Sequence, residues 1–269
     1  MRHSASGPQL YAETLAMEEI PIASPNPKVL SAAGNCLMGH ICDEGAIACA
    51  WMHSAGVRQM AGYTVPTWFG YGGWGLHKYF TRVSGLSFAQ AFFANMQSLL
   101  LQLSKYEAAE GAAGLLEDAA GDIDAACEAL YRRCFDSTES REGLSRAHLG
   151  LLFDRDHVVL YGDPAWPAAV APPGPPPYTI DFEVTESTAT TVVWHCTVHV
   201  HAAGSWTSPT PDDKTTSPGR PPFALLPTSV RAARVRDGPA VATRLFVLFD
   251  VDGPCAAGDT LSATIEGSL

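Results

Sequence analysis

The chain has 269 residues, 46% of them hydrophobic, and a formal net charge of −11 at pH 7. This acidic balance argues against nucleic acid or an anionic membrane surface as a partner, and the longest apolar runs fall well short of the ~20 residues that a membrane-spanning helix needs. The first residues lack the apolar segment of a signal peptide, and the seven cysteines show neither a Cys-x-x-Cys pair nor a repeating spacing, which argues against a zinc ribbon or a disulfide framework.

A strand–helix–strand crossover is predicted over residues 28–63. Residues 28–33 and 57–63 are short apolar runs of the kind found in buried strands. Between them, residues 43–55 predict a helix with Asp43 as its cap and Gly56 as its stop. We therefore expect an α/β region with a parallel sheet.

The turn after the first strand, residues 34–39, reads Gly-Asn-Cys-Leu-Met-Gly. A thiol at the tip of a strand and close to a helix N-terminus can be nucleophilic, because such a position favours the thiolate. The two glycines of the turn, Gly34 and Gly39, let the backbone come close to a substrate and let consecutive amides point at one spot. Gly34 and Asn35 are the candidate oxyanion residues beside Cys36. The alternative is that Cys36 is a small buried hydrophobe, which free cysteines usually are.

An uncharged loop rich in aromatic residues and glycine follows the second strand at residues 64–75. A loop at the carboxyl end of a strand is suited to wall a substrate cleft, although it could instead simply pack on the core. Next, residues 87–107 predict a long helix that is capped by Ser87 and has apolar residues at helical spacing. The remaining elements before residue 167 are expected to be helices at 76–81, 123–135 and 144–152, an acidic solvated stretch at 107–124, and a strand at 158–161.

The composition changes at residues 168–177, where prolines predict a stiff linker. Beyond it the pattern is entirely β, and residues 203–222 form a polar, proline-rich stretch that is expected to be an exposed loop. We expect an α/β domain over 1–167, the linker, and a small β-sandwich over 178–269. The strands of this sandwich are predicted at residues 178–186, 190–201, 229–235, 243–251 and 260–266.

Three histidines, His195, His199 and His201, fall on one side of a predicted strand. Alternating imidazoles are a weak candidate for a Zn²⁺ or Cu²⁺ site, which would need Asp181 or Glu183 to arrive from a neighbouring strand. The alternative is an exposed polar face of a sandwich strand. No metal or cofactor is otherwise indicated.

Four stretches in this order resemble the gingipain family of cysteine peptidases in the caspase-like clan. They are residues 28–39, residues 56–64 with Trp68 after them, the 87–107 helix, and Tyr161-Gly162-Asp163-Pro164-Ala165-Trp166. The resemblance implies a caspase-like parallel sheet followed by an immunoglobulin-like sandwich. It implies a cysteine endopeptidase that forms an acyl-enzyme on Cys36, with Thr64 and Trp68 at the substrate pocket and a protein or peptide as substrate.

The chain departs from that family at the catalytic base, which is a histidine in a His-Gly step on the strand before the cysteine strand. None of the nine histidines precedes a glycine, and only His3 comes before Cys36. We therefore expect a truncated catalytic domain, incomplete at its N-terminus and inactive alone; His40 and His53 are weak substitutes for the base. The resemblance suggests an exported or cell-surface protein, although the chain shows no signal peptide. The alternative function is a non-catalytic binding or structural module that uses residues 64–75 and the β-sandwich.

Overall fold

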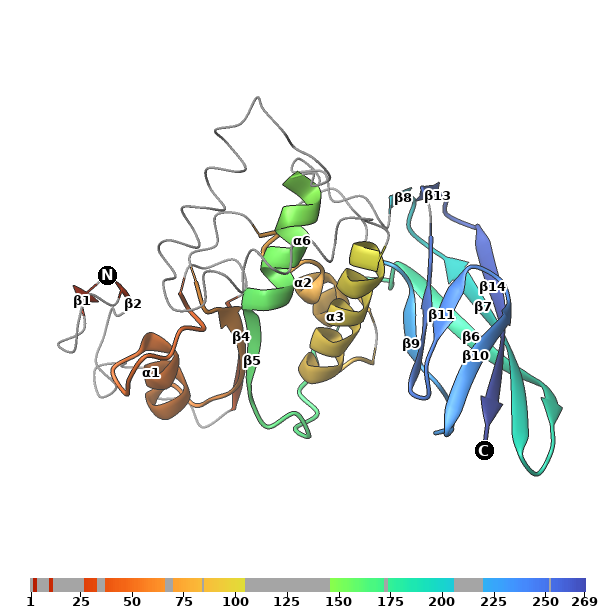
Figure 1. The fold of residues 1–269 in the computed structure, drawn as a ribbon, viewed down its shortest axis with the longest axis horizontal. Coiled ribbons are helices and arrows are strands. Elements are labelled where there is room, and N and C mark those ends of the chain that lie inside the picture. The colour runs from red at the N-terminus through yellow and green to blue at the C-terminus, as the bar shows by residue number, and fades with distance from the viewer. Residues whose placement is uncertain are drawn as a thin grey trace.

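The computed structural model describes residues 2–3, 10–11, 27–32, 37–65, 70–83, 85–104, 146–171, 174–205, 220–251 and 253–269. Within these ranges the chain has mixed α and β content, with few helices and several separate sheets. Figure 1 shows helix α1 (Ile47–Ser54) on the outer, N-terminal side of a small sheet, and the other labelled helices between that sheet and the larger antiparallel sheets on the C-terminal side.

A three-stranded sheet contains the predicted crossover. β3 (Lys28–Ser31) and β4 (Val57–Tyr63) are parallel, and α1 (Ile47–Ser54) lies between them in the chain. β5 (Val158–Gly162) pairs antiparallel with β4, so the strand order is β3-β4-β5. Every residue of the central strand except Arg58 is buried, as expected for a strand that is covered on both faces.

Helix α1 begins four residues later than its sequence suggests. Ala46 is the N-cap residue, and Asp43 instead accepts a hydrogen bond from the Gly45 N–H on its Oδ1 (2.9 Å), which closes a turn ahead of the helix. An aspartate that bonds two residues ahead competes with helical capping, and this explains the shift. Gly56 follows the helix with φ 72°, so the predicted stop is confirmed.

Three further helices are described: α2 (Leu76–Arg82), α3 (Phe88–Ser104) and α6 (Arg146–His157). The predicted cap of α3 is confirmed. The Ser87 N–H donates to Gln90 Oε1 (2.9 Å), and the Gln90 N–H donates to Ser87 Oγ (3.3 Å). This reciprocal pair satisfies two amide donors that a helix N-terminus otherwise leaves unpaired.

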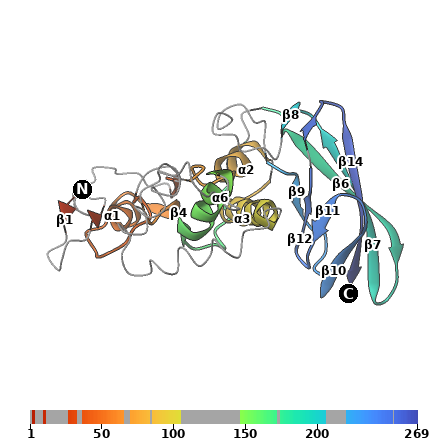
Figure 2. The ribbon, with the colours of Figure 1, turned by 45° about the horizontal axis from the view of Figure 1, so that its top comes forward.

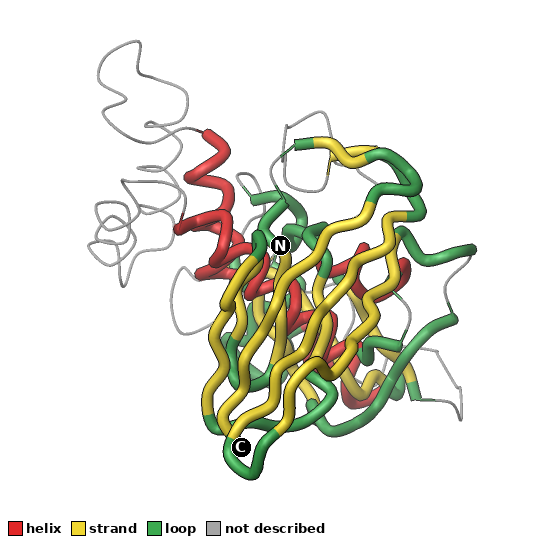
Figure 3. The backbone as a smooth tube through the Cα atoms, turned by 90° about the vertical axis from the view of Figure 1, so that its right-hand side faces the viewer, coloured by secondary structure: helices red, strands yellow, loops and turns green. Residues whose placement is uncertain are grey.

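The C-terminal region is built of antiparallel strands. A four-stranded sheet has the order β10-β14-β7-β6, and a three-stranded sheet has the order β11-β12-β9. Figure 3 looks toward the first of these sheets. The larger strands are β6 (Tyr178–Ser187), β7 (Thr191–Val200), β10 (Ala232–Asp237) and β14 (Thr260–Ser268). The smaller sheet holds β9 (Phe223–Leu225), β11 (Ala240–Ala242) and β12 (Phe246–Phe249). Two short pairs complete the strands: β1 (Arg2–His3) with β2 (Leu10–Tyr11), and β8 (Gly204–Ser205) with β13 (Pro254–Cys255).

The three-stranded sheet of the C-terminal region, β11-β12-β9, is packed on both of its faces. On one face, Val247 and Phe249 join a cluster with the four-stranded sheet around Trp194. On the other face, Phe246 and Leu248 join a second cluster with residues of α2 and α3. Figure 2 shows β9 and β12 on the side of the β region that faces these helices. Because both faces are covered, all four residues of β12 are buried.

The prediction that residues 203–222 form an exposed loop is wrong at the C-terminal end of this stretch. Arg220, Pro221 and Pro222 are buried, and the Arg220 side chain retains only 5% of its accessible surface. The segment is buried because it leads into β9, which lies between the two clusters. The helix predicted at 123–135 and the acidic stretch at 107–124 lie outside the described residues, and the domain boundaries at 167 and 178 stay a prediction.

Candidate functional site

The predicted nucleophile turn is described only at its flanks, because Gly34, Asn35 and Cys36 lie outside the described residues. On one side, the Ala32 N–H donates to the Ala61 carbonyl (2.8 Å). On the other side, the Leu37 N–H donates to the Val65 carbonyl (3.3 Å). Both flanks therefore lie beside the carboxyl-terminal end of β4.

Residues just after the turn are fixed tightly against the sheet. The Gly39 N–H donates to the Tyr63 carbonyl (2.8 Å), and the Tyr161 hydroxyl donates to the Gly39 carbonyl (2.7 Å). A Cβ on Gly39 would lie 2.6 Å from the Gly62 carbonyl oxygen, so only glycine allows this approach. The predicted glycine at the end of the turn thus brings the chain onto β4.

Two non-glycine residues in the described part of the chain have a positive φ, and both lie in the segments that the sequence singles out. Leu37, directly after Cys36, has φ 58°, and Trp74, near the end of the aromatic loop, has φ 60°. Both are almost fully buried, at 3% and 4% exposure. Bulky residues rarely adopt this conformation, and backbone strain of this kind gathers at active sites, ligand clamps and switches.

Asp154 of α6 anchors the described end of the aromatic loop. Its carboxylate accepts hydrogen bonds from the Tyr71 N–H (3.0 and 3.1 Å to its two oxygens) and from the Tyr63 hydroxyl. The Tyr63 oxygen in turn accepts the Gly73 N–H (3.0 Å). Burial, together with the neighbouring Asp154 charge, raises the pKa of Tyr63, which is therefore a stable donor to this carboxylate.

Trp74 fixes the same loop to the helices and to the β region. Its Nε1–H donates to Ser98 Oγ (3.1 Å), and the Arg220 guanidinium lies over its ring at 4.0 Å from the centroid. Arg220 Nη2 also donates to the Trp74 carbonyl (3.2 Å). The next amide, the Gly75 N–H, donates to Asn95 Oδ1 (2.6 Å). The end of the loop at Gly70–Gly75 therefore packs into the core, as the alternative interpretation of this loop expects.

Of the two predicted pocket residues, Trp68 lies outside the described residues and Thr64 is half-buried. The Thr64 N–H donates to the His157 carbonyl (2.9 Å), which places Thr64 where β4 meets the end of α6. Thr64 thus lies next to Val65, whose carbonyl binds Leu37. The predicted nucleophile turn and the predicted pocket start at the same edge of the sheet.

His157 is an imidazole near this edge that the sequence patterns do not single out. Its Nδ1 lies 3.0 Å from the Phe153 carbonyl, and its ring stacks on the Phe153 ring at 4.6 Å. A carbonyl only accepts, so Nδ1 carries the proton and Nε2 is the basic nitrogen. Burial lowers the pKa of His157, which keeps it neutral near pH 7. No sequence signal marks it, because it follows the polar run Asp-Arg-Asp and precedes a valine.

The four described thiols, Cys42, Cys49, Cys196 and Cys255, are all free. Burial raises the pKa of each of them, to about 12 for Cys196. A raised pKa disfavours the thiolate, so none of these four is an activated nucleophile. Of the two histidines considered as substitutes for the base, His40 donates its backbone N–H to the Leu37 carbonyl (3.1 Å) and His53 is exposed on α1.

His195 and His199 on β7, and His201 directly after it, alternate with buried residues, as predicted. The partners of His199 and His201 lie on the neighbouring strand. His199 Nε2 pairs with Asp181 Oδ2 (3.2 Å), and His201 Nε2 lies 3.1 Å from Thr179 Oγ1. The Cα atoms of His195 and His199 are four strand residues apart, about 13 Å along β7. Their side chains project side by side from the strand, so the two rings are too far apart to share one ion with bonds of about 2 Å. Within the described ranges no three His, Cys, Asp or Glu side chains are grouped to hold a metal ion.

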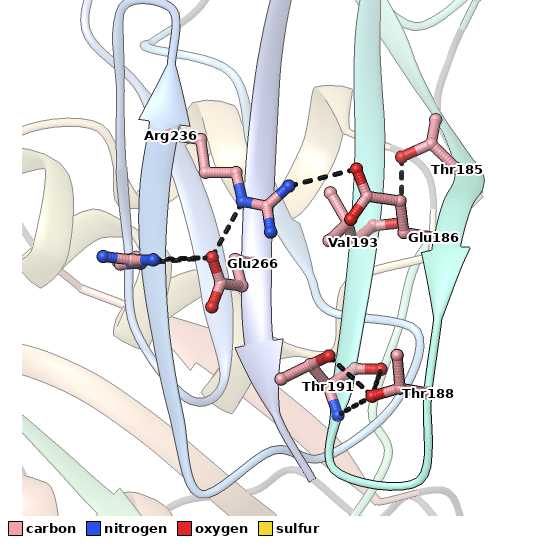
Figure 4. Close-up of polar contacts among 8 residues, drawn as sticks. Thr185, Glu186, Thr188, Thr191, Val193, Arg236 and Glu266 are labelled. Carbon is pink, nitrogen blue, oxygen red and sulfur yellow. Dashed lines mark hydrogen bonds and ion pairs between the residues drawn. The ribbon is translucent and has the colours of Figure 1, made fainter.

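The outer face of the four-stranded sheet also carries a network of charged side chains (Figure 4). Glu266 Oε2 accepts from Arg236 Nε (2.7 Å) and from Arg234 Nη2 (2.8 Å), and Arg236 Nη1 donates to Glu186 Oε1 (3.2 Å). The bonds from Arg236 and Arg234 hold the pKa of Glu266 below its usual range. The network ties β10, β14 and β6 together, and its four charged side chains are paired with one another.

None of the described helices combines the length and apolar character that crossing a bilayer requires. Comparison with known proteins finds no matching family model, no matching curated protein and no matching solved structure.

Proposed function

We propose that this chain is a cysteine-dependent peptide hydrolase of gingipain type, with a caspase-like sheet and an immunoglobulin-like sandwich. One observation carries the proposal: the two flanks of the predicted nucleophile turn, Ala32 and Leu37, lie at the carboxyl-terminal end of the parallel pair β3–β4. In open α/β sheets, ligands bind outside the carboxyl ends of the strands. The positive φ of Leu37, directly after Cys36, adds a strained backbone at that place.

In this proposal the Cys36 thiolate attacks the carbonyl carbon of a peptide bond. The amides of Gly34, Asn35 and Cys36 stabilise the oxyanion. The C–N bond then breaks, the amine leaves with the proton that the base took from the thiol, and an acyl-enzyme results. Water then adds to the thioester carbonyl and releases the carboxylic acid and the thiol. Thr64 and Trp68 would border the pocket for the residue before the cleaved bond.

We assign the proton-accepting role to His157. Its Nδ1–H is directed at the Phe153 carbonyl, which leaves Nε2 as a neutral base at pH 7. The hydrogen bond from Thr64 to the His157 carbonyl brings this residue to the edge where Leu37 is bound. A neutral imidazole with one fixed tautomer is what thiol activation requires.

A non-catalytic binding or structural module is the second candidate, and the aromatic loop favours it. Gly73, Trp74 and Gly75 are buried, so this part of the loop packs on the core and does not line an open cleft. In such a module Cys36 would be an inert thiol like the four that the structure describes.

Competitive alkylation separates these two candidates. The folded chain is treated briefly with iodoacetamide at pH 7.5, and each cysteine peptide is quantified by mass spectrometry. Cys42 and Cys49 serve as internal standards with a raised pKa. We expect Cys36 to react at least about tenfold faster than either, because lowering a thiol pKa toward 7 greatly increases the thiolate fraction.

His157→Gln should reduce that excess rate and flatten its rise with pH, and the urea-unfolded chain should alkylate all seven thiols at similar rates. Equal rates at Cys36, Cys42 and Cys49 in the folded chain would remove the hydrolase proposal. A fast Cys36 that is indifferent to His157→Gln would remove only the assignment of the base.

A further inference from the structure

A groove of about 440 Å³ lies where the edges of the two antiparallel sheets meet the turn between α2 and α3. One wall is the first part of β6, residues 178–181, and the other is β9. Val83, Gly85 and Leu86 of the α2–α3 turn complete the lining together with Pro176. The groove is distant in sequence from Cys36 and shares no residue with the site proposed above.

The β6 wall presents backbone groups that no strand pairs. β6 is the last strand of its sheet, and the His201 N–H donates to the Pro177 carbonyl (2.8 Å) at its start. This bond sets the alternation of the antiparallel ladder, so Thr179 and Asp181 bond to β7. The N–H and C=O of Ile180 then point away from β7, and they have no partner among the described residues.

The β9 wall likewise presents backbone groups that point away from the neighbouring strand of its sheet. The Phe249 N–H donates to the Pro222 carbonyl (2.9 Å), which by the same alternation directs the backbone groups of Phe223 and Leu225 away from β12. The outward backbone groups of Phe223 are already bound by the Tyr178 hydroxyl, which accepts the Phe223 N–H (3.1 Å) and donates to the Phe223 carbonyl (3.4 Å). The outward N–H and C=O of Leu225 have no partner among the residues that the structure describes, and Leu225 is 38% exposed.

The acidic side chains of β6 determine which kind of strand could pair with its open edge. Asp181 and Glu183 project from its solvent face, and the Asp181 side chain is 76% exposed beside His199. No lysine or proline blocks the strand, although these residues commonly protect sheet edges. A second copy of β6 would bring acidic side chains against acidic side chains, which is unfavourable. A strand with basic residues on that face would be attracted.

We propose that this groove binds an extended polypeptide segment that adds to the edge of β6. The backbone of the segment pairs with the N–H and C=O of Ile180, and one apolar side chain enters the groove between Leu86, Ile180 and Phe223. Lysine or arginine at the alternate positions faces Asp181 and Glu183. Main-chain hydrogen bonds supply affinity in this mode of recognition, and the side-chain pocket with its charges supplies selectivity.

The probe is the capped peptide acetyl-Lys-Val-Lys-Val-Lys-amide, titrated into the full ¹⁵N-labelled chain and followed by amide chemical shifts. We expect a dissociation constant below about 1 mM, with the largest shifts at residues 178–182 and 223–225. The same peptide with N-methyl groups on its valines cannot donate the strand hydrogen bonds and should bind at least about tenfold more weakly.

Two variants test the walls of the groove separately. Ile180→Pro removes the N–H that points outward, a change that edge strands tolerate, and it should weaken binding about tenfold, whereas Ile180→Val keeps this N–H and should change binding by less than about twofold. Asp181→Asn removes charge from an exposed side chain and should weaken binding about two- to fivefold at low salt.

A second control peptide, acetyl-Glu-Val-Glu-Val-Glu-amide, replaces each lysine of the probe with glutamate. Three results would overturn the proposal. Shifts that map away from β6 and β9, equal binding of the N-methylated peptide, or equal binding of the glutamate peptide would each contradict strand addition at an acidic edge. If Ile180→Pro loses the near-ultraviolet circular dichroism of the folded chain, Asp181→Asn and the two control peptides still decide the outcome. Because the probe does not involve Cys36, failure here leaves the proposed hydrolase function unaffected.

Discussion

Replacing Tyr63 with phenylalanine removes one oxygen atom from a buried polar cluster that also contains Asp154. The Tyr63 side chain is fully buried, and its hydroxyl is a donor to Asp154 and an acceptor for the Gly73 N–H (3.0 Å). The ring still fits in the variant and keeps its contact with Phe153, at 5.9 Å between ring centroids. The change therefore tests hydrogen bonding with little loss of packing.

The expected cost follows from the two partners. Loss of the acceptor leaves the buried Gly73 N–H unpaired, which costs about 1–3 kcal/mol. Loss of the donor weakens the surroundings of a carboxylate that is only 1% exposed, and a hydrogen bond to a charged group contributes about 1.5–3 kcal/mol. Asp154 keeps its bonds from Tyr71, so we expect a net loss of about 3 kcal/mol, a large part of the ~5–15 kcal/mol that stabilises a typical domain.

Urea unfolding measures this loss, with Tyr161→Phe as the matched control. The Tyr161 hydroxyl is half-buried and donates one hydrogen bond to the Gly39 carbonyl (2.7 Å). Removing this hydroxyl should therefore cost only about 0.5–1.5 kcal/mol. Hydrogen exchange should also speed up at Tyr71 and Gly73 in Tyr63→Phe and stay unchanged there in the control. If the two variants lose the same stability, Asp154 does not anchor the loop through Tyr63.

Three further changes address other contacts of the fold. Gly70→Ala would place a methyl group against Asp154 Oδ1 and the Tyr63 hydroxyl, and it should cost about 1–3 kcal/mol in the same urea assay. Arg220→Lys loses the planar stacking on Trp74 and should cost about 1–2 kcal/mol, read as a lower unfolding midpoint and a change in tryptophan fluorescence. Glu266 has a lowered pKa, so its stabilising charge is fully present above pH 4.5 and is lost as the pH falls through its native pKa; Glu266→Gln should therefore flatten the decline of Tm below pH 4.5.

Local sequence signals predicted the elements that depend on local chemistry. Ser87 and Gln90 form the cap of α3, Gly56 ends α1, and the crossover from β3 to β4 follows from two short apolar runs around a helical stretch. The cap and the stop need only neighbouring residues to be satisfied, and the crossover follows the local order of strand, helix and strand. The alternation that placed His195 and His199 on one face of β7, with His201 directly after the strand, is local in the same way.

Tertiary contacts determine what the sequence did not predict. The run Phe246–Phe249 shows apolar character but not that helices cover one face and a sheet the other. Arg220 lies in a proline-rich stretch that looks exposed, and only the Trp74 ring, distant in sequence, explains its burial. Asp154 is likewise a helical aspartate in sequence, and its role appears only once Tyr63 and Tyr71 are brought to it.

The aromatic loop and the β region depend on each other through these contacts. Trp74 is held in a left-handed conformation while Arg220, the residue three positions before β9, lies over its ring and bonds its carbonyl. The strained conformation persists only if its surroundings outweigh the roughly 1–3 kcal/mol that such a residue costs. Since Phe223 and Phe246 pack on α2 and α3 within the same cluster, the free energy that places β9 also holds the end of the loop. We therefore expect any substrate or partner that moves this loop also to disturb the packing of β9 against α2 and α3.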